Sequence, residues 1–207
     1  MAVVIVVAQQ KGGAGKTTIA ANLAAALAAE MAVAVMDIDP QRSLARWHAL
    51  RGGRAPAVAL SEVSGWRMGA ELERLRRAHG AVVVDSPPVV DEDARRAVRA
   101  ADLVLVPVQP SPPDLWAAAG TLKLAAEERR RAVLLLNRAP AAGGLRAAAE
   151  AAIAGAGWPR LGAVLGNRVA FAGAFARGAG VTETAARSPA AAELMAVLAE
   201  ARRLWNG

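Results

Sequence analysis

The stretch Gln9-Gln10-Lys11-Gly12-Gly13-Ala14-Gly15-Lys16-Thr17-Thr18 lies between an apolar run, residues 3–8, and an alanine-rich segment, residues 19–30. A short β-branched run, a glycine-rich loop and a helix-forming segment occur in this order where a strand delivers a phosphate-binding loop to a helix N-terminus. The glycines let the backbone approach an anion closely, so that its N–H groups point at phosphate oxygens. The stretch therefore predicts a nucleotide-binding loop.

Two side chains of this loop carry specific chemistry. Lys16 is placed to reach the β and γ phosphates, and the hydroxyl of Thr17 is placed to ligate Mg²⁺. The chain has 25 basic residues, of which only Lys11, Lys16 and Lys123 are lysines, so two of its three lysines stand in one loop. A compact ammonium suits a phosphate cradle better than a planar guanidinium does. The remaining nucleotide-binding candidates in the loop are Gly12, Gly13, Ala14, Gly15 and Thr18.

The loop departs from the common pattern G-x-x-x-x-G-K-[ST], because Gln10 stands where that pattern has its first glycine and Lys11 follows it. The string KGGAGKTT resembles the deviant Walker A motif of the ParA/MinD ATPases. This resemblance implies that Lys11 reaches across a dimer interface to the phosphates bound by the other subunit. Lys11 and Lys16 are then both catalytic candidates.

Carboxylates follow two further apolar runs, residues 33–36 and 81–84. The carboxyl ends of parallel strands beside a phosphate loop are where Mg²⁺ and an attacking water are handled. The strings DIDPQ and VVVDSPP resemble the second and third nucleotide motifs of the same family. The resemblance assigns Asp39 to positioning the hydrolytic water, Asp37 to the outer Mg²⁺ shell, and Asp85 to holding Mg²⁺ through water. Asp-Pro is also a common turn, which is the plainer interpretation of Asp39.

Later segments supply candidates for base and DNA contacts. Asn137 follows the apolar run 132–136, and the resemblance implies that it hydrogen-bonds adenine, whose edge needs both a donor and an acceptor; turn formation alone would also favour asparagine there. We assign its neighbour Arg138 to nucleotide binding as well. The segment from residue 167 to residue 183 resembles a family segment near the base and the DNA-facing surface, which makes Arg168 and Arg177 DNA-binding candidates. We interpret Asp114 as the N-cap of a helix over residues 115–128.

The composition sets the fold class and the environment. A chain of 207 residues with 55% hydrophobic composition is long enough for one α/β domain, residues 1–207. We expect a single-domain P-loop NTPase with a mostly parallel sheet of about seven or eight strands, the last of them at residues 161–165, and helices on both faces. No apolar run approaches the ~20 residues of a membrane span, and no basic leader precedes the first strand, so we expect a cytoplasmic protein. The absence of cysteine excludes disulfides, thiolate zinc sites and iron–sulfur clusters.

The net charge of +7 indicates an acidic polymer or surface as partner, unless arginine is merely the default surface residue. The resemblance implies an ATPase that uses ATP/ADP and Mg²⁺, forms a nucleotide-dependent homodimer, and binds DNA non-specifically, so that it is nucleoid-associated when ATP is bound. A ParB-like or other adaptor protein would stimulate hydrolysis, and the cargo would be a plasmid, a chromosome region or a protein assembly.

Two other functions remain open. The first is a MinD-like ATPase that switches on a membrane surface, because the closing segment ends in Arg202-Arg203-Leu204-Trp205. We expect this segment, residues 189–205, to pack on the sheet instead. The second is a nucleotide-dependent ligase of small metabolites such as dethiobiotin synthetase, whose loop is similar; Lys11 argues against it.

Overall fold

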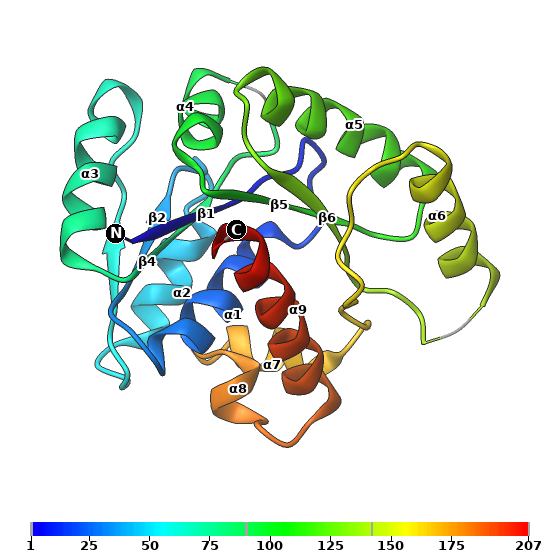
Figure 1. Cartoon of the computed structure of the whole chain (residues 1–207). Coiled ribbons are helices and arrows are strands. Elements are labelled where there is room, and N and C mark those ends of the chain that lie inside the picture. The colour runs from blue at the N-terminus through cyan, green and yellow to red at the C-terminus, as the bar shows by residue number, and fades with distance from the viewer. Residues whose placement is uncertain (1, 90, 142, 207) are drawn as a thin grey trace.

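The computed structural model describes residues 2–89, 91–141 and 143–206, and its centre is a parallel β-sheet (Figure 1). In the described residues the sheet has six strands, in the spatial order β3-β2-β4-β1-β5-β6. Their bounds are β1 Val3–Val7, β2 Val33–Asp37, β3 Val58–Ser61, β4 Ala81–Asp85, β5 Leu103–Val108 and β6 Ala132–Leu136. The strands are runs of valine, leucine and alanine that are buried almost throughout, as a parallel sheet covered on both faces requires.

Helices form a layer on each face of the sheet (Figure 1). One layer contains α1 Lys16–Ala28, α2 Ser43–Arg51, α7 Val169–Phe175, α8 Val181–Thr184 and α9 Pro189–Asn206. The other contains the 3-10 helix η1 Gly65–Arg67, α3 Met68–Ala78, α4 Glu92–Ala100, α5 Pro112–Glu127 and α6 Gly144–Gly155. Successive side chains of β1 alternate between the two cores, because strand side chains point to opposite faces.

The strand register brings the functional strand tips together. Val7, the last residue of β1, is level with Asp85 of β4, and Asp37 of β2 is level with Asp85 on the other side. β1 also pairs with β5, so the chain crosses from one side of β1 to the other between β4 and β5. In open α/β sheets, ligands bind outside the carboxyl ends of the strands at such a switch point.

The predicted count of seven or eight strands is wrong, because the apolar segment 161–165 does not form a strand. This segment runs beside β6 and is hydrogen-bonded to it at Leu161 and Leu165, but its bridges are isolated: Arg160 pairs with Leu134 of β6, and Gly166 pairs with Ala139 beyond the end of β6. The carboxylate of Glu200 in α9 accepts the N–H groups of Gly162 and Ala163, at 2.7 and 2.8 Å. A side chain of α9 therefore takes two consecutive backbone N–H groups of this segment, which interrupts its regular pairing with β6.

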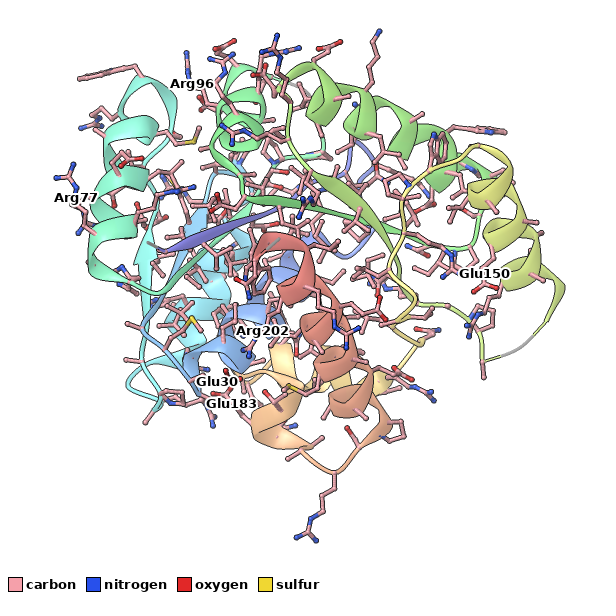
Figure 2. The ribbon with its side chains drawn as sticks, in the orientation of Figure 1. Glu30, Arg77, Arg96, Glu150, Glu183 and Arg202 are labelled. Atoms are coloured by element: carbon pink, nitrogen blue, oxygen red, sulfur yellow. The ribbon has the colours of Figure 1, made fainter. Side chains whose placement is uncertain are left out.

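The closing helix α9 packs on the core, as predicted. Leu194, Val197, Leu198 and Ala201 are buried in the hydrophobic core that α9 shares with α1. Arg202 donates to Glu30 at 2.7 Å, across the gap between α9 and the end of α1 (Figure 2). No helix in the described part of the chain combines the length and apolar character needed to cross a membrane.

Candidate nucleotide-binding site

The loop between β1 and α1 has the backbone of a phosphate cradle. Gly13 and Gly15 have φ angles of 79° and 96°, in the left-handed region that favours glycine, and Gly15 is the N-cap of α1. The loop lines a pocket of about 210 Å³, which opens at the N-terminal end of α1. The positive end of the helix dipole and the free N–H groups of the first turn make this an anion site. The lining residues outside the loop are Asp39, Gln41, Ser43, Pro88 and Arg138.

Lys16 lies in the lining of this pocket. Its residue surface is only 6% exposed, and its Nζ lies 3.4 Å from the carbonyl oxygen of Lys11. Burial lowers the pKa of Lys16, while the nearby carboxylates of Asp85 and Asp39 oppose that shift. The ammonium is thus short of water, and negative charge from a phosphate would stabilise it further.

Asp85 is the carboxylate best suited to hold hydrated Mg²⁺. It is fully buried, and no hydrogen bond of good geometry reaches either of its oxygens from the described residues. Burial raises the pKa of Asp85 to about 7, although the hydroxyl of Thr17 and the ammonium of Lys16 both act to lower it. A buried carboxylate without partners is costly unless a ligand completes its surroundings, and a cation with bound water does so.

Asp37 and Asp39 differ in what their oxygens accept. Both oxygens of Asp37 are used by the backbone, one by the N–H of Asp39 at 3.1 Å and one by the N–H of Ala45 at 2.8 Å. Burial raises the pKa of Asp37, and these hydrogen bonds oppose the rise. Asp39 is half-buried and lines the phosphate pocket, and from the described residues it accepts one hydrogen bond, from the N–H of Gln41 at 2.9 Å. Asp37 therefore shapes the turn into α2, and Asp39 presents a carboxylate to the pocket.

No group of three or more histidine, aspartate or glutamate side chains that could enclose a metal ion occurs among the described residues. An Mg²⁺ ion in this pocket would take its ligands from the hydroxyl of Thr17, phosphate oxygens and water, with Asp85 binding that water. This is the coordination that Mg²⁺ commonly has in phosphate sites, where it keeps several waters.

Lys11 points away from the pocket that Lys16 occupies. Its ammonium forms an ion pair with Asp114, whose side chain is 1% exposed, and Lys11 is not one of the residues that line the phosphate pocket. The carboxylate of Asp114 also accepts the hydroxyl of Ser111 at 2.7 Å and the N–H of Gln109 at 3.2 Å. These donors together hold the pKa of Asp114 below its usual value despite its burial. The two lysines of the loop thus face different surroundings.

The N-cap prediction for Asp114 is wrong. Helix α5 begins at Pro112, and Ser111 is its N-cap, because a proline is well suited to the first helical position. Asp114 lies in the first turn of α5, where its side chain is free to hold Lys11. Sequence reasoning missed this pairing because the two residues are 103 positions apart.

Two glutamine side chains hold the loop against β5 and α5. Gln9 is buried, and its side-chain amide donates to the carbonyl oxygens of Pro107 and Asp114 at 3.2 and 3.3 Å. Gln10 occupies the position at which the common loop pattern has glycine, and its side chain lies on α5 at Gly120, where a Cβ atom would come within 2.3 Å of it. The loop is therefore packed on α5, the helix that carries Asp114.

A second pocket, of about 510 Å³, continues from the loop and contains Asn137, Arg138 and Arg168 in its lining. The side-chain amide of Asn137 donates to the carbonyl oxygen of Ala14 at 2.8 Å, and a Cβ atom on Gly15 would lie 2.4 Å from that amide nitrogen. Asn137 thus fastens the loop and lines the pocket at the same time. Arg138 has a φ of 50° and lies 3.4 Å from the carbonyl oxygen of Gly13.

The two DNA-binding candidates have different surroundings. Arg168 is exposed, makes an ion pair with Glu193 of α9 at 2.7 Å, and is one of the residues that line the second pocket. Arg177 is exposed, and its Nε donates to the carbonyl oxygen of Gly173 at 3.0 Å. Both arginines are therefore at the surface, and they differ in that Arg168 is paired with a carboxylate.

Comparisons with known proteins find a matching family model and curated relatives. The family model described as the CobQ/CobB/MinD/ParA nucleotide binding domain matches residues 5–181. A protein of Halothiobacillus neapolitanus, Maintenance of carboxysome distribution protein A, is 32% identical over 198 residues, which cover 91% of each chain. The protein of the same name from Gloeobacter kilaueensis is 48% identical over 115 residues, which are 54% of this chain and 51% of that protein. The chain thus matches about half of one curated relative and nearly all of the other.

Among solved structures, the fold resembles that of a putative plasmid partition protein from Borrelia burgdorferi B31 bound to AMPPNP. The TM-score is 0.80 at 15% identity, over 98% of this chain and 99% of that one.

Proposed function

The chain belongs to the CobQ/CobB/MinD/ParA family of nucleotide-binding domains, and from this premise we propose that it is a ParA-like ATPase that positions a cargo in the cell. The observation that carries the proposal is that the two lysines of the loop lie in different places. Lys16 lies in the phosphate pocket, whereas Lys11 is held outside it by Asp114. A lysine that cannot touch its own subunit's phosphates without moving is available for those of a second subunit.

The proposed reaction is the hydrolysis of ATP to ADP and phosphate. The loop N–H groups and Lys16 bind the phosphates, and Asp39 orients the attacking water at the mouth of the pocket. Asp85 and the hydroxyl of Thr17 would hold Mg²⁺, which supplies positive charge to the phosphate oxygens when it is bound. Asn137 and Arg138 line the continuation of the pocket, where the base and ribose of ATP would lie.

ATP would bring two subunits together, with Lys11 of each subunit on the phosphates held by the other. Phosphoryl transfer is accelerated by cations that neutralise charge in the transition state, and a group supplied by a second subunit makes hydrolysis depend on dimerisation. The nucleotide then acts as a timer: the dimer persists while ATP is intact and separates after hydrolysis.

The dimer would bind DNA non-specifically and release it on hydrolysis. The net charge of +7 favours a polyanion, and such binding weakens steeply as salt rises because counterions are released. The two curated relatives are named for the maintenance of carboxysome distribution, and the structural neighbour for plasmid partition. We propose a protein assembly or a plasmid as cargo and an adaptor protein that stimulates hydrolysis.

The test is co-sedimentation with plasmid DNA in ATP and in ADP, with anionic liposomes as the second arm. The proposal predicts DNA binding in ATP that is lost in ADP and in the Lys11→Ala variant. Binding to liposomes in ATP without binding to DNA would favour the MinD-like function and contradict the proposal. The buried apolar side of α9 favours DNA, since that side is not available to a bilayer.

The ligase alternative is tested by the same variant. A Lys11→Ala protein that still dimerises and hydrolyses ATP at the normal rate would remove the role assigned to this lysine. A small-metabolite ligase would then be the better explanation of the phosphate loop.

A further inference from the structure

A groove of about 770 Å³ lies at the opposite end of the sheet from the phosphate loop. It opens at the amino end of β6 and is bounded by the C-terminal part of α5 and the C-terminal part of α9. It shares no lining residue with the two nucleotide pockets. Its floor is apolar and is made by Leu122, Ala126, Val133, Trp158, Leu161 and Leu204.

Four arginines surround this floor: Arg130 and Arg131 from the turn before β6, Arg160, and Arg203 from α9. All four are exposed. Within the described part of the chain, Arg130, Arg131 and Arg203 make no side-chain hydrogen bond or ion pair. Arg160 has one long ion pair, 3.8 Å from Glu150, and donates to the carbonyl oxygen of Leu161.

The single carboxylate in the lining does not neutralise these arginines. Glu200 accepts the backbone N–H groups of Gly162 and Ala163, so its charge is directed at the backbone. Arginines on other faces are arranged differently: Arg95 and Arg99, for example, both donate to Glu128. The groove therefore combines a hydrophobic floor with a rim of four guanidinium groups, of which only that of Arg160 has an ion pair, a long one, among the described residues.

We propose that this groove docks an acidic amphipathic segment of a partner protein. Apolar side chains of the segment would fill the floor, and its carboxylates would meet the rim, where arginine forms strong bidentate hydrogen bonds. An amphipathic helix presents its anchors at i, i+3 or i+4, and i+7, which suits a groove of this kind.

The chemistry of the floor argues against duplex DNA as the occupant. Phosphates would gain from the arginines but nothing from Trp158, Leu161 and Leu204, whose apolar surface would stay in contact with water. A peptide uses both halves of the site. The walls are also preformed, since Pro159 and Leu161 are hydrogen-bonded to Leu134 of β6, each at 2.9 Å, and a rigid site loses less conformational entropy on binding.

The inference is independent of the proposed ATPase activity, and the absence of cysteine makes it directly testable. An environment-sensitive dye is attached to Ala126→Cys inside the groove and, as the matched control, to Ala70→Cys on the exposed face of α3. The probe is a synthetic peptide of about 14 residues with leucine at helical anchor spacing and glutamate elsewhere. We expect a saturable change in emission from position 126 and none from position 70.

Charge-reversal variants test whether the rim arginines contribute to peptide binding. Arg203→Glu and Arg131→Glu should each weaken peptide binding about tenfold, because each removes an attractive pair and adds a repulsive one. Arg187→Glu makes the same change of charge on an exposed arginine outside the groove and should leave binding unchanged. Peptides with glutamine in place of glutamate, or serine in place of leucine, should bind more weakly. Anisotropy of a labelled peptide with the cysteine-free protein repeats the measurement without the reporter.

The proposal is overturned if the glutamine peptide binds as tightly as the acidic one, or if Arg187→Glu reduces binding as much as Arg203→Glu. It is also overturned if an oligonucleotide duplex changes the emission at position 126, and Arg203→Glu abolishes that change, while the peptide has no effect. Binding of a fluorescent ATP analogue by each variant shows that the fold is intact, and its retention separates this result from any failure of the nucleotide site.

Discussion

The ion pair between Lys11 and Asp114 predicts that Asp114 restrains dimerisation. If Lys11 acts on a second subunit, it must leave this carboxylate, and the cost of leaving opposes association. Asp114→Asn removes the charge and keeps the shape. Asp114 is 1% exposed and Lys11 38% exposed at the side chain, so the pair lies between a buried and a surface ion pair. Because water screens the exposed ammonium of Lys11, we assign this ion pair a stabilisation of about 1–2 kcal/mol in each subunit.

A dimer contains two such ion pairs, so breaking both costs about 2–4 kcal/mol. The Asp114→Asn variant does not have this cost and should therefore dimerise roughly 30- to 900-fold more tightly. The assay is sedimentation equilibrium over graded protein concentrations, with a non-hydrolysable ATP analogue and Mg²⁺. Ser111→Ala is the matched control, because it removes a hydroxyl donor from the same carboxylate and leaves the ion pair in place. The double variant with Lys11→Ala and Asp114→Asn should dimerise no more tightly than Lys11→Ala alone, because Lys11→Ala has no ion pair left to break.

Weaker or unchanged dimerisation of Asp114→Asn would refute this reasoning. That result would mean that Asp114 stays with Lys11 in the dimer and helps to place it. A gain that persisted in the double variant would also refute it, since the effect would then not pass through Lys11.

Other parts of the site give predictions that separate binding, catalysis and stability. Asp39→Ala should bind ATP and persist as a dimer but hydrolyse poorly; a monomer by light scattering in ATP would contradict the role of Asp39. The raised pKa of Asp85, about 7, means that the nucleotide-free protein loses stability as pH rises from about 4 to 7; Asp85→Asn should remove that loss and raise the melting temperature at pH 8. Gly178→Ala should cost about 2–4 kcal/mol of unfolding free energy, because φ is +61° and a Cβ would lie 2.1 Å from the nitrogen of Arg51; Gly53→Ala, with nothing within 4 Å, is the matched control for denaturant unfolding.

The features that the sequence predicts well are those encoded by neighbouring residues. The loop from Gln9 to Thr18 carries its own glycines, lysines and flanking strand and helix, so its structure follows from local chemistry. Asp37 and Asp85 each end a buried apolar run, and parallel strands bring such ends to one edge. The parallel sheet was therefore predicted correctly, and the place of its ligand site stays a prediction.

The features that were missed depend on contacts between distant segments. Nothing near residues 161–165 shows that Glu200 will take two of their N–H groups, which is why a strand was expected there. Nothing near Arg168 shows that Glu193 will hold its guanidinium beside the second pocket. In each case a side chain of α9 decides the outcome, and its position is known only once the helix has packed on the sheet.

The central claim is that Lys11 of one subunit contacts the phosphates of the nucleotide that the other subunit binds. The most direct test is a crystal structure with a non-hydrolysable ATP analogue and Mg²⁺, together with the molecular mass in solution under the same conditions. We predict a dimer in which each Lys11 has left Asp114 and its Nζ contacts phosphate oxygens bound by the other subunit. A nucleotide-bound monomer in which Lys11 still pairs with its own Asp114, with a solution mass to match, would contradict the account.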